Sequence, residues 1–87
     1  MYISKRNGKV VLYDTDKIVN SILKANSETL EEEVSTHMAS FIADEVFAKL
    51  TEEKDIITTQ DVKECVYQRL IEMGLPATAR NYMEYSK

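Results

Sequence analysis

The sequence predicts a mainly α member of the α+β class, in which a four-helix bundle is capped by a small two- or three-stranded β-sheet. Near the start of the chain, two runs of apolar and β-branched residues flank Asn7-Gly8. From about residue 15 onward, apolar residues recur at helical spacing, and start and stop signals divide this part into four segments. Short connections favour packing of neighbouring helices, and 87 residues suffice for a single domain, residues 1–87.

The first predicted element is a β-hairpin. Asn-Gly readily supplies the two positive-φ residues of a type I′ turn, so the expected strands are residues 2–6 and 9–13. Gly8 is expected to occupy one of the positive-φ positions. Ile56-Ile57 is too short to stand alone, and it is the candidate third strand beside the hairpin.

Capping residues and apolar stripes predict the first two helices. Asp14-Thr15-Asp16 offers acceptor side chains to a first helical turn, which predicts a helix over residues 15–25. Thr29 followed by Glu32 has the pattern of a capping box and predicts that the second helix opens there, with Glu31-Glu32-Glu33 complementing its dipole. The predicted buried face of this helix consists of Val34, Met38, Phe41, Ile42, Val46 and Leu50.

Similar signals predict the last two helices. Thr58-Thr59-Gln60-Asp61 repeats the capping pattern, and Gly74 supplies the left-handed residue that commonly follows a helix end. Pro76 can begin a new helix without wasting a donor, so the last helix is expected over residues 77–85. The apolar face of the third helix consists of Val62, Cys65, Val66, Leu70 and Met73. The last helix presents Ala79, Tyr82, Met83 and Tyr85.

Charge is distributed unevenly along the chain, whose formal net charge is −4. Residues 1–24 hold five cations against two anions, whereas residues 25–87 hold six cations against thirteen anions. A basic end on an acidic chain suits a compact phosphate ligand better than a long nucleic acid, whose affinity comes from many phosphate contacts. A set of solvated lysines is the alternative reading of the same charges.

The residue types exclude several other functions. A single cysteine permits no internal disulfide and no zinc site of the CxxC kind. His37 has no second histidine and no cysteine near it in the sequence, and Cys65 is expected to pack as an inert thiol. Glycine-rich phosphate loops and nucleophile motifs are missing, so the chain is not expected to be an enzyme. With no apolar run of about 20 residues and no signal-peptide pattern, we expect a cytoplasmic protein without a membrane partner.

Three cations form the candidate binding group. Lys5 and Arg6 lie near the end of the first predicted strand, and Lys17 lies in the first turn of the following helix. Neighbouring strand residues point to opposite faces, but near a strand end both can reach around a phosphate chain that meets a helix start. The sequence therefore permits a triphosphate clamp.

The sequence resembles the ATP-cone domain over nearly all of its length. Lys5-Arg6-Asn7-Gly8 resembles the family's KRDG, and Tyr13-Asp14-x-x-Lys17-Ile18 resembles F-(D/N)-x-x-K-I. The stretch Ile57-Thr58-Thr59-Gln60-Asp61-Val62 resembles I-x-T-x-(D/E)-I, and Tyr82-Met83-Glu84-Tyr85 resembles the closing tyrosine series. Two departures are Asn7 in place of the commoner aspartate and Ser86 where the family often has arginine, for which Lys87 is the candidate substitute.

The resemblance implies a nucleotide-sensing module that binds ATP or dATP between the sheet and the helices, with Mg as the candidate accompanying ion. It implies phosphate contacts from Lys5, Arg6 and Lys17, with Lys87 as a candidate fourth cation. Contacts to adenine or ribose are implied near Asp14, Ile18 and Thr59. Main-chain contacts are implied at Ile3 and Tyr13.

The resemblance also implies a regulatory rather than a catalytic role. Because Met1 directly precedes the first predicted strand, we favour the N-terminal domain of a ribonucleotide reductase large subunit, with the anaerobic class as the candidate. The implied partners are the catalytic part of that enzyme or an identical chain. Three alternatives stay open: the cone of a nucleotide-sensing transcriptional repressor, a helical interaction module whose nucleotide site has decayed, and a small nucleic-acid-binding domain, which the overall acidity disfavours.

Overall fold

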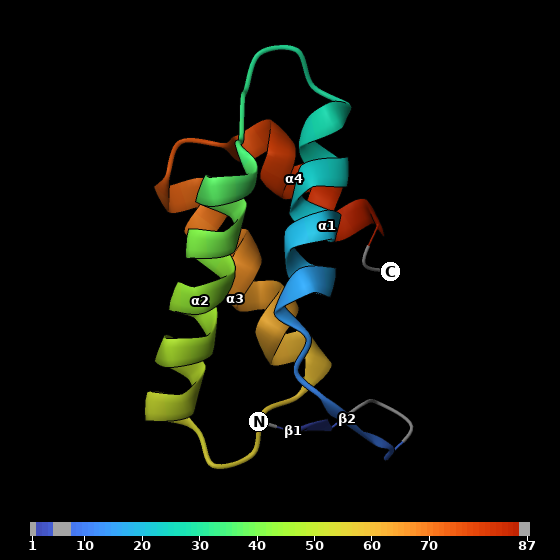
Figure 1. The fold of residues 1–87 in the computed structure, drawn as a ribbon, viewed down its shortest axis with the longest axis vertical. Coiled ribbons are helices and arrows are strands. Elements are labelled where there is room, and N and C mark those ends of the chain that lie inside the picture. The colour runs from blue at the N-terminus through green and yellow to red at the C-terminus, as the bar shows by residue number, and fades with distance from the viewer. Residues whose placement is uncertain (1, 5–7, 86–87) are drawn as a thin grey trace.

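The computed structural model describes residues 2–4 and 8–85 and confirms a mainly helical fold (Figure 1). The described residues form strands β1 (Tyr2–Ser4) and β2 (Val10–Leu12) and helices α1 (Thr15–Ser27), α2 (Thr36–Glu53), α3 (Thr59–Glu72) and α4 (Pro76–Tyr85). Each helix packs against its neighbours in sequence, and α4 packs back against α1, which closes the bundle. In Figure 1 the two strands lie at the end of the molecule where α1 begins.

Helix α1 begins where the sequence predicted and ends two residues later. Asp14 is its N-cap, and the Asp14 carboxylate accepts hydrogen bonds from the backbone N–H groups of Asp16 at 3.0 Å and Lys17 at 3.4 Å. These bonds satisfy donors that have no partner inside the helix. Asp14 thereby determines where the chain turns from β2 into α1.

The predicted start of the second helix is wrong. Helix α2 begins at Thr36 with Ser35 as its N-cap, and its first turn holds no acidic residue, so Glu31-Glu32-Glu33 lies in the connection before it. The Glu32 carboxylate instead accepts hydrogen bonds from the N–H groups of Ala77 at 2.8 Å and Thr78 at 2.7 Å. The first turn of α4 has unpaired donors, and one carboxylate can accept from two of them. Glu32 therefore caps a helix that is distant in the sequence.

Phe41 does not belong to the buried face of α2, since its side chain is 53% exposed. Val34 is buried as expected, although it precedes the helix, and Met38 packs at the edge of the core. At 3.6 residues per turn, Phe41 lies on nearly the opposite side of the helix from Ala39 and Ala43, so it faces solvent. The buried residues of α2 are Ala39, Ile42, Ala43, Val46 and Leu50.

Helix α3 has the predicted capping signals at both ends. Thr58 and Asp61 form a reciprocal capping box at its start. At its end, Gly74 has φ +77°, the N–H of Leu75 donates to the carbonyl of Leu70, and the N–H of Gly74 donates to the carbonyl of Ile71. This pair of bonds is a Schellman motif, which requires a left-handed residue at the position of Gly74.

The two strands pair in antiparallel fashion, and β2 is shorter than the predicted residues 9–13. Residues 5–6 of the first predicted strand lie outside the described residues. Ser4 pairs with Val10, whereas a two-residue turn at Asn7-Gly8 would pair Ser4 with Val11, so the pairing is shifted by one residue. Gly8 has the expected positive φ, at +86°, while Asn7 lies outside the described residues. The shift decides which side chains face the bundle, because neighbouring strand residues point to opposite faces.

The predicted third strand at Ile56-Ile57 is wrong. The N–H of Ser4 donates to the carbonyl of Ile57 at 2.8 Å, and Ser4 forms an isolated parallel bridge with Thr58. Ile56 is 75% exposed, whereas Ile57 is buried in the core. A single bridge is too short for a strand, but it ties β1 to the start of α3.

The core runs through the whole bundle and includes Ile3 and Tyr13 from the N-terminal part of the chain. Its fully buried members come from all four helices and include Ile22, Ile42, Val66 and Ala79. Within residues 2–4 and 8–85, no helix is long and apolar enough to cross a membrane.

Candidate functional site

A cleft of about 230 Å³ lies where β1, the junction of β2 with α1, and the first turns of α1 and α3 meet. Tyr82 of α4 also lines it. Six residues that the sequence marked as binding residues line this one cleft, although they come from distant parts of the chain: Ile3, Tyr13, Asp14, Lys17, Ile18 and Thr59. The remaining three, Lys5, Arg6 and Lys87, lie outside the described residues.

Asp14 and Lys17 lie at the start of α1, and their roles there differ. The Asp14 carboxylate accepts hydrogen bonds from the first turn of the helix, so Oδ1 is engaged in holding that turn. The Lys17 side chain is exposed beside the cleft, in the first helical turn, where the positive end of the helix dipole adds to its charge. This part of the cleft therefore carries one ammonium group, from Lys17, beside the carboxylate of Asp14.

Tyr13 forms a wall of the cleft and ties that wall to α2. Its side chain is buried, and its hydroxyl donates a hydrogen bond to the backbone carbonyl of Ala43 at 3.0 Å. Its ring lies 5.3 Å from the ring of Phe47, between centroids, at an interplanar angle of 55°. Burial, followed by the nearby Tyr82, raises the pKa of Tyr13 to about 12. The phenol is therefore neutral at physiological pH.

Thr59 reaches the cleft because Thr58 and Asp61 determine where α3 begins. The Thr58 hydroxyl accepts from the N–H of Asp61 at 3.1 Å, and the Asp61 carboxylate accepts from the N–H of Thr58 at 2.9 Å. Lys54 donates to the same carboxylate at 2.8 Å, and this bond, helped by the N–H of Thr58, lowers the pKa of Asp61. The first turn of α3 is thus fixed by the reciprocal bonds of Thr58 and Asp61 and by the ion pair of Asp61 with Lys54.

Five further cleft residues were not among those marked in the sequence. Ser21 follows Lys17 by four positions on α1, and Lys63 follows Thr59 by four positions on α3. Residues at this spacing share a helix face, so the periodicity around Lys17 and Thr59 could have identified both. The complete set of additional residues is Leu12, Ser21, Val62, Lys63 and Tyr82.

The cleft combines a mostly apolar lining with two ammonium groups, Lys17 from α1 and Lys63 from α3, and with the carboxylate of Asp14. Apolar lining with a few polar groups at defined positions is typical of small-molecule sites. Such a cleft can hold a flat apolar group while its cations attract an attached anion. The chemistry therefore fits an organic phosphate.

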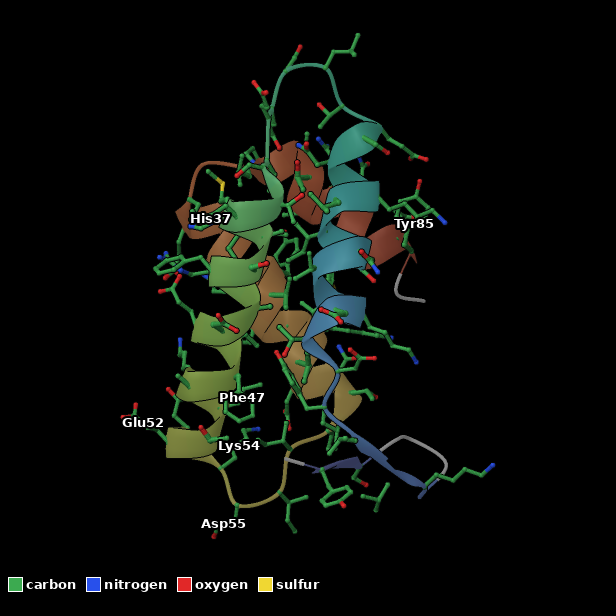
Figure 2. All side chains as sticks on the ribbon, in the orientation of Figure 1. His37, Phe47, Glu52, Lys54, Asp55 and Tyr85 are labelled. Atoms are coloured by element: carbon green, nitrogen blue, oxygen red, sulfur yellow. The ribbon has the colours of Figure 1, made fainter. Side chains whose placement is uncertain are left out.

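Two other residues that the sequence singled out lie away from this cleft. His37 is exposed near the start of α2, and Figure 2 shows it toward the end of the molecule opposite the strands. Cys65 is half-buried in a second cleft between α2 and α3, and burial raises the pKa of its thiol. Within residues 2–4 and 8–85, no group of three or more histidine, cysteine, aspartate or glutamate side chains could hold a metal ion.

The family model described as the ATP cone domain matches residues 1–87, the whole chain. The comparison with curated proteins gives no match.

Proposed function

Because this chain belongs to the ATP-cone domain family, we propose that its cleft between the starts of α1 and α3 binds ATP or dATP. Membership in the family makes the chain a nucleotide-binding regulatory module, not a catalytic one. The observation that supports the proposed location is the meeting around one cleft of six residues that the family resemblance implies as ligand contacts.

The size of the cleft supports an extended pose of the nucleotide. Its volume of about 230 Å³ lies below the roughly 300–1,000 Å³ of typical ligand pockets, so a whole nucleotide triphosphate does not fit inside. The base and sugar occupy the cleft, and the phosphates extend past Lys17 at the start of α1. Lys5 and Arg6, which follow β1 in the sequence, are the further phosphate ligands of this proposal, with Lys87 as another.

The other marked residues receive distinct roles. Ile18 contacts the base, Thr59 contacts the base or ribose, and Ile3 and Tyr13 contribute main-chain groups. Asp14 acts chiefly by holding the first turn of α1, since Oδ1 is engaged there. Mg would accompany the phosphates and offset part of their negative charge.

Titration calorimetry of the chain with ATP, dATP and tripolyphosphate tests this proposal. We expect ATP and dATP to saturate at one or two sites per chain, and tripolyphosphate to bind more weakly because it lacks the base. A short DNA duplex at moderate salt is the control for nucleic-acid binding and should give no heat of binding. Absence of binding by all three phosphate compounds would reject the proposed site, and self-association in that case would support an interaction module.

We further propose that the chain regulates a ribonucleotide reductase, as the N-terminal domain of a large subunit of the anaerobic class, in the cytoplasm. ATP and dATP would favour different helix arrangements and hence different assemblies with the catalytic part or with an identical chain. The shift is limited by the difference in affinity of each nucleotide for the two states. Sedimentation of the full protein with each nucleotide tests this, since equal assembly in both would contradict it. The alternative parent is a nucleotide-sensing transcriptional repressor.

A further inference from the structure

Ser21 brings a hydroxyl group to the cleft from the middle of α1. Its side chain is half-buried and lines the cleft together with Ile18, from the preceding turn of the same helix. In the described part of the chain, every buried side-chain nitrogen or oxygen has a hydrogen-bond partner. The Ser21 hydroxyl makes no side-chain hydrogen bond within residues 2–4 and 8–85, so it is open to the cleft.

Two other helical hydroxyls of this chain are engaged in local hydrogen bonds. Ser27, near the end of α1, donates its hydroxyl to the carbonyl of Lys24 at 2.7 Å. Thr51 in α2 donates its hydroxyl to the carbonyl of Phe47 at 2.8 Å. Such local bonds are the usual way for a helical hydroxyl to satisfy its donor. The Ser21 hydroxyl is therefore available to a ligand, whereas these two are engaged.

The position of Ser21 along α1 indicates which part of a ligand it would meet. It follows Lys17 by four residues, which is about 6 Å along the helix axis at 1.5 Å per residue. If Lys17 holds a phosphate at the start of the helix, Ser21 lies one turn further along α1, on a cleft that the apolar Ile18 and Tyr82 also line. A polar atom on a mostly apolar wall is suited to orient a flat heterocycle, whose ring packs on the apolar groups.

We propose that Ser21 is a base-reading residue, whose hydroxyl bonds to the edge of the purine in the nucleotide. This inference rests on the proposed function, because it needs the nucleotide to occupy this cleft. A hydroxyl can both donate and accept, so it can pair with either an amino group or a ring nitrogen of adenine. Ser21 then contributes to recognition of the base and leaves the phosphates to the cations.

The test compares Ser21→Ala with the parent chain by titration calorimetry with ATP, dATP and tripolyphosphate. One lost neutral hydrogen bond should weaken ATP and dATP binding about threefold to tenfold. Tripolyphosphate binding should stay within about twofold of the parent, because it has no base. Ser21→Thr keeps the hydroxyl and should restore the parent affinities. Ser27→Ala, which removes a hydroxyl from the same helix outside the cleft, is the matched control and should leave all three unchanged.

The outcomes separate this inference from the proposed function. If the parent binds ATP and Ser21→Ala binds it as tightly, the assignment of Ser21 is wrong while the nucleotide site stands. If Ser21→Ala weakens the binding of ATP but not of dATP, the Ser21 hydroxyl contacts the ribose 2′-hydroxyl. That result would also overturn the assignment of Ser21 to the base. If Ser21→Ala weakens tripolyphosphate binding as much as ATP binding, Ser21 contacts the phosphates or supports the fold. That result would overturn the assignment of Ser21 to the base as well. If the parent binds none of the three, the proposed function fails, and this inference with it.

Discussion

At the scale of single residues, Lys17 and Tyr13 have the clearest separable roles. Lys17 is an exposed cation at the mouth of the cleft, in the first turn of α1. Tyr13 is a buried wall residue that is bonded to α2. Substitution of the first should therefore affect ligand binding, and substitution of the second should affect folding.

Lys17→Ala should weaken ATP, dATP and tripolyphosphate binding alike, since it removes a charge from the phosphates. A charge-assisted hydrogen bond contributes about 1.5–3 kcal/mol, so the dissociation constants should rise about tenfold or more. Calorimetric titration measures all three. Lys24→Ala, on the same helix with its ammonium 4.7 Å from the ring centroid of Tyr85, is the control and should bind as the parent does. Parent-like affinities in Lys17→Ala would remove Lys17 from the phosphate site.

Tyr13→Phe should destabilise the fold by about 1 kcal/mol, the net value of one intramolecular hydrogen bond. The pH dependence should also change. Since the folded pKa of Tyr13, about 12, exceeds the ordinary value of 10.0, this contribution is complete below pH 10 and is lost as pH rises toward 12. Urea unfolding between pH 8 and 12 should show that the free energy of unfolding falls less with rising pH in the variant than in the parent. If the free energy of unfolding falls equally in the variant and the parent, groups other than Tyr13 determine the alkaline unfolding.

At the scale of elements, the connection of residues 28–35 does more than join α1 to α2. The Asn26 amide donates to the carbonyl of Glu32 at 2.9 Å and to the Thr78 hydroxyl at 3.1 Å, and it accepts from the N–H of Val34 at 3.0 Å. Glu32 then bonds to the first turn of α4. The end of α1, this connection and the start of α4 are thus held as one polar cluster.

Glu32→Ala should destabilise the fold by about 0.5–2 kcal/mol, the usual effect of removing a helix cap. Burial disfavours the charged carboxylate, but the N–H groups of Thr78 and Ala77 outweigh it, so the pKa of Glu32 is lowered from 4.5. Its contribution is therefore complete above pH 4.5 and is lost as pH falls through the lowered folded value. Thermal melts of the variant and parent should differ at pH 7 and converge in acid. The exposed neighbour Glu33, changed to alanine, is the control.

Local signals predicted helix boundaries well wherever the capping partner is close in sequence. Asp14, Thr58 and Gly74 bond within a few residues, so their patterns are readable without the fold. Glu32 was misread because the donors that it satisfies lie 45 and 46 residues away. Phe41 was misread because the buried face of α2 depends on how neighbouring helices pack, which periodicity alone does not determine.

At the scale of the whole molecule, the candidate site could be assigned from sequence only in part. Motif residues such as Lys17 and Thr59 were identifiable because their spacing resembles a family pattern. Tyr82 belongs to the closing tyrosine series, but no pattern in the sequence assigned it to this cleft, which it reaches through the packing of α4 on α1. Ser21 carries no motif, and only its spacing of four residues from Lys17 places it on the same helix face. In a small fold, residues from several helices and strands meet at one site, so the lining of that site depends on how these elements pack together.

A ligand that binds only the folded chain should raise its melting temperature. Stabilisation is about 2.7 kcal/mol at 100 times the dissociation constant, and 1 kcal/mol shifts the midpoint by about 4–8 °C in domains of 60–100 residues. Saturating ATP or dATP should therefore raise the midpoint by about 10 °C or more, and adenosine by far less. A thermal scan with ATP, dATP, GTP, adenosine and tripolyphosphate measures this. Negligible shifts for all five would count against nucleotide sensing by the isolated chain.

The aromatic walls of the cleft also give this molecule its own optical signal. The chain has no tryptophan and five tyrosines, and two of them, Tyr13 and Tyr82, are buried and line the cleft. Near-ultraviolet circular dichroism arises mainly from aromatic rings held in an asymmetric environment, so these two rings should dominate the spectrum. Tripolyphosphate does not absorb there. Binding of tripolyphosphate to the cleft can therefore be followed in the unlabelled protein, as a change in the circular dichroism of Tyr13 and Tyr82.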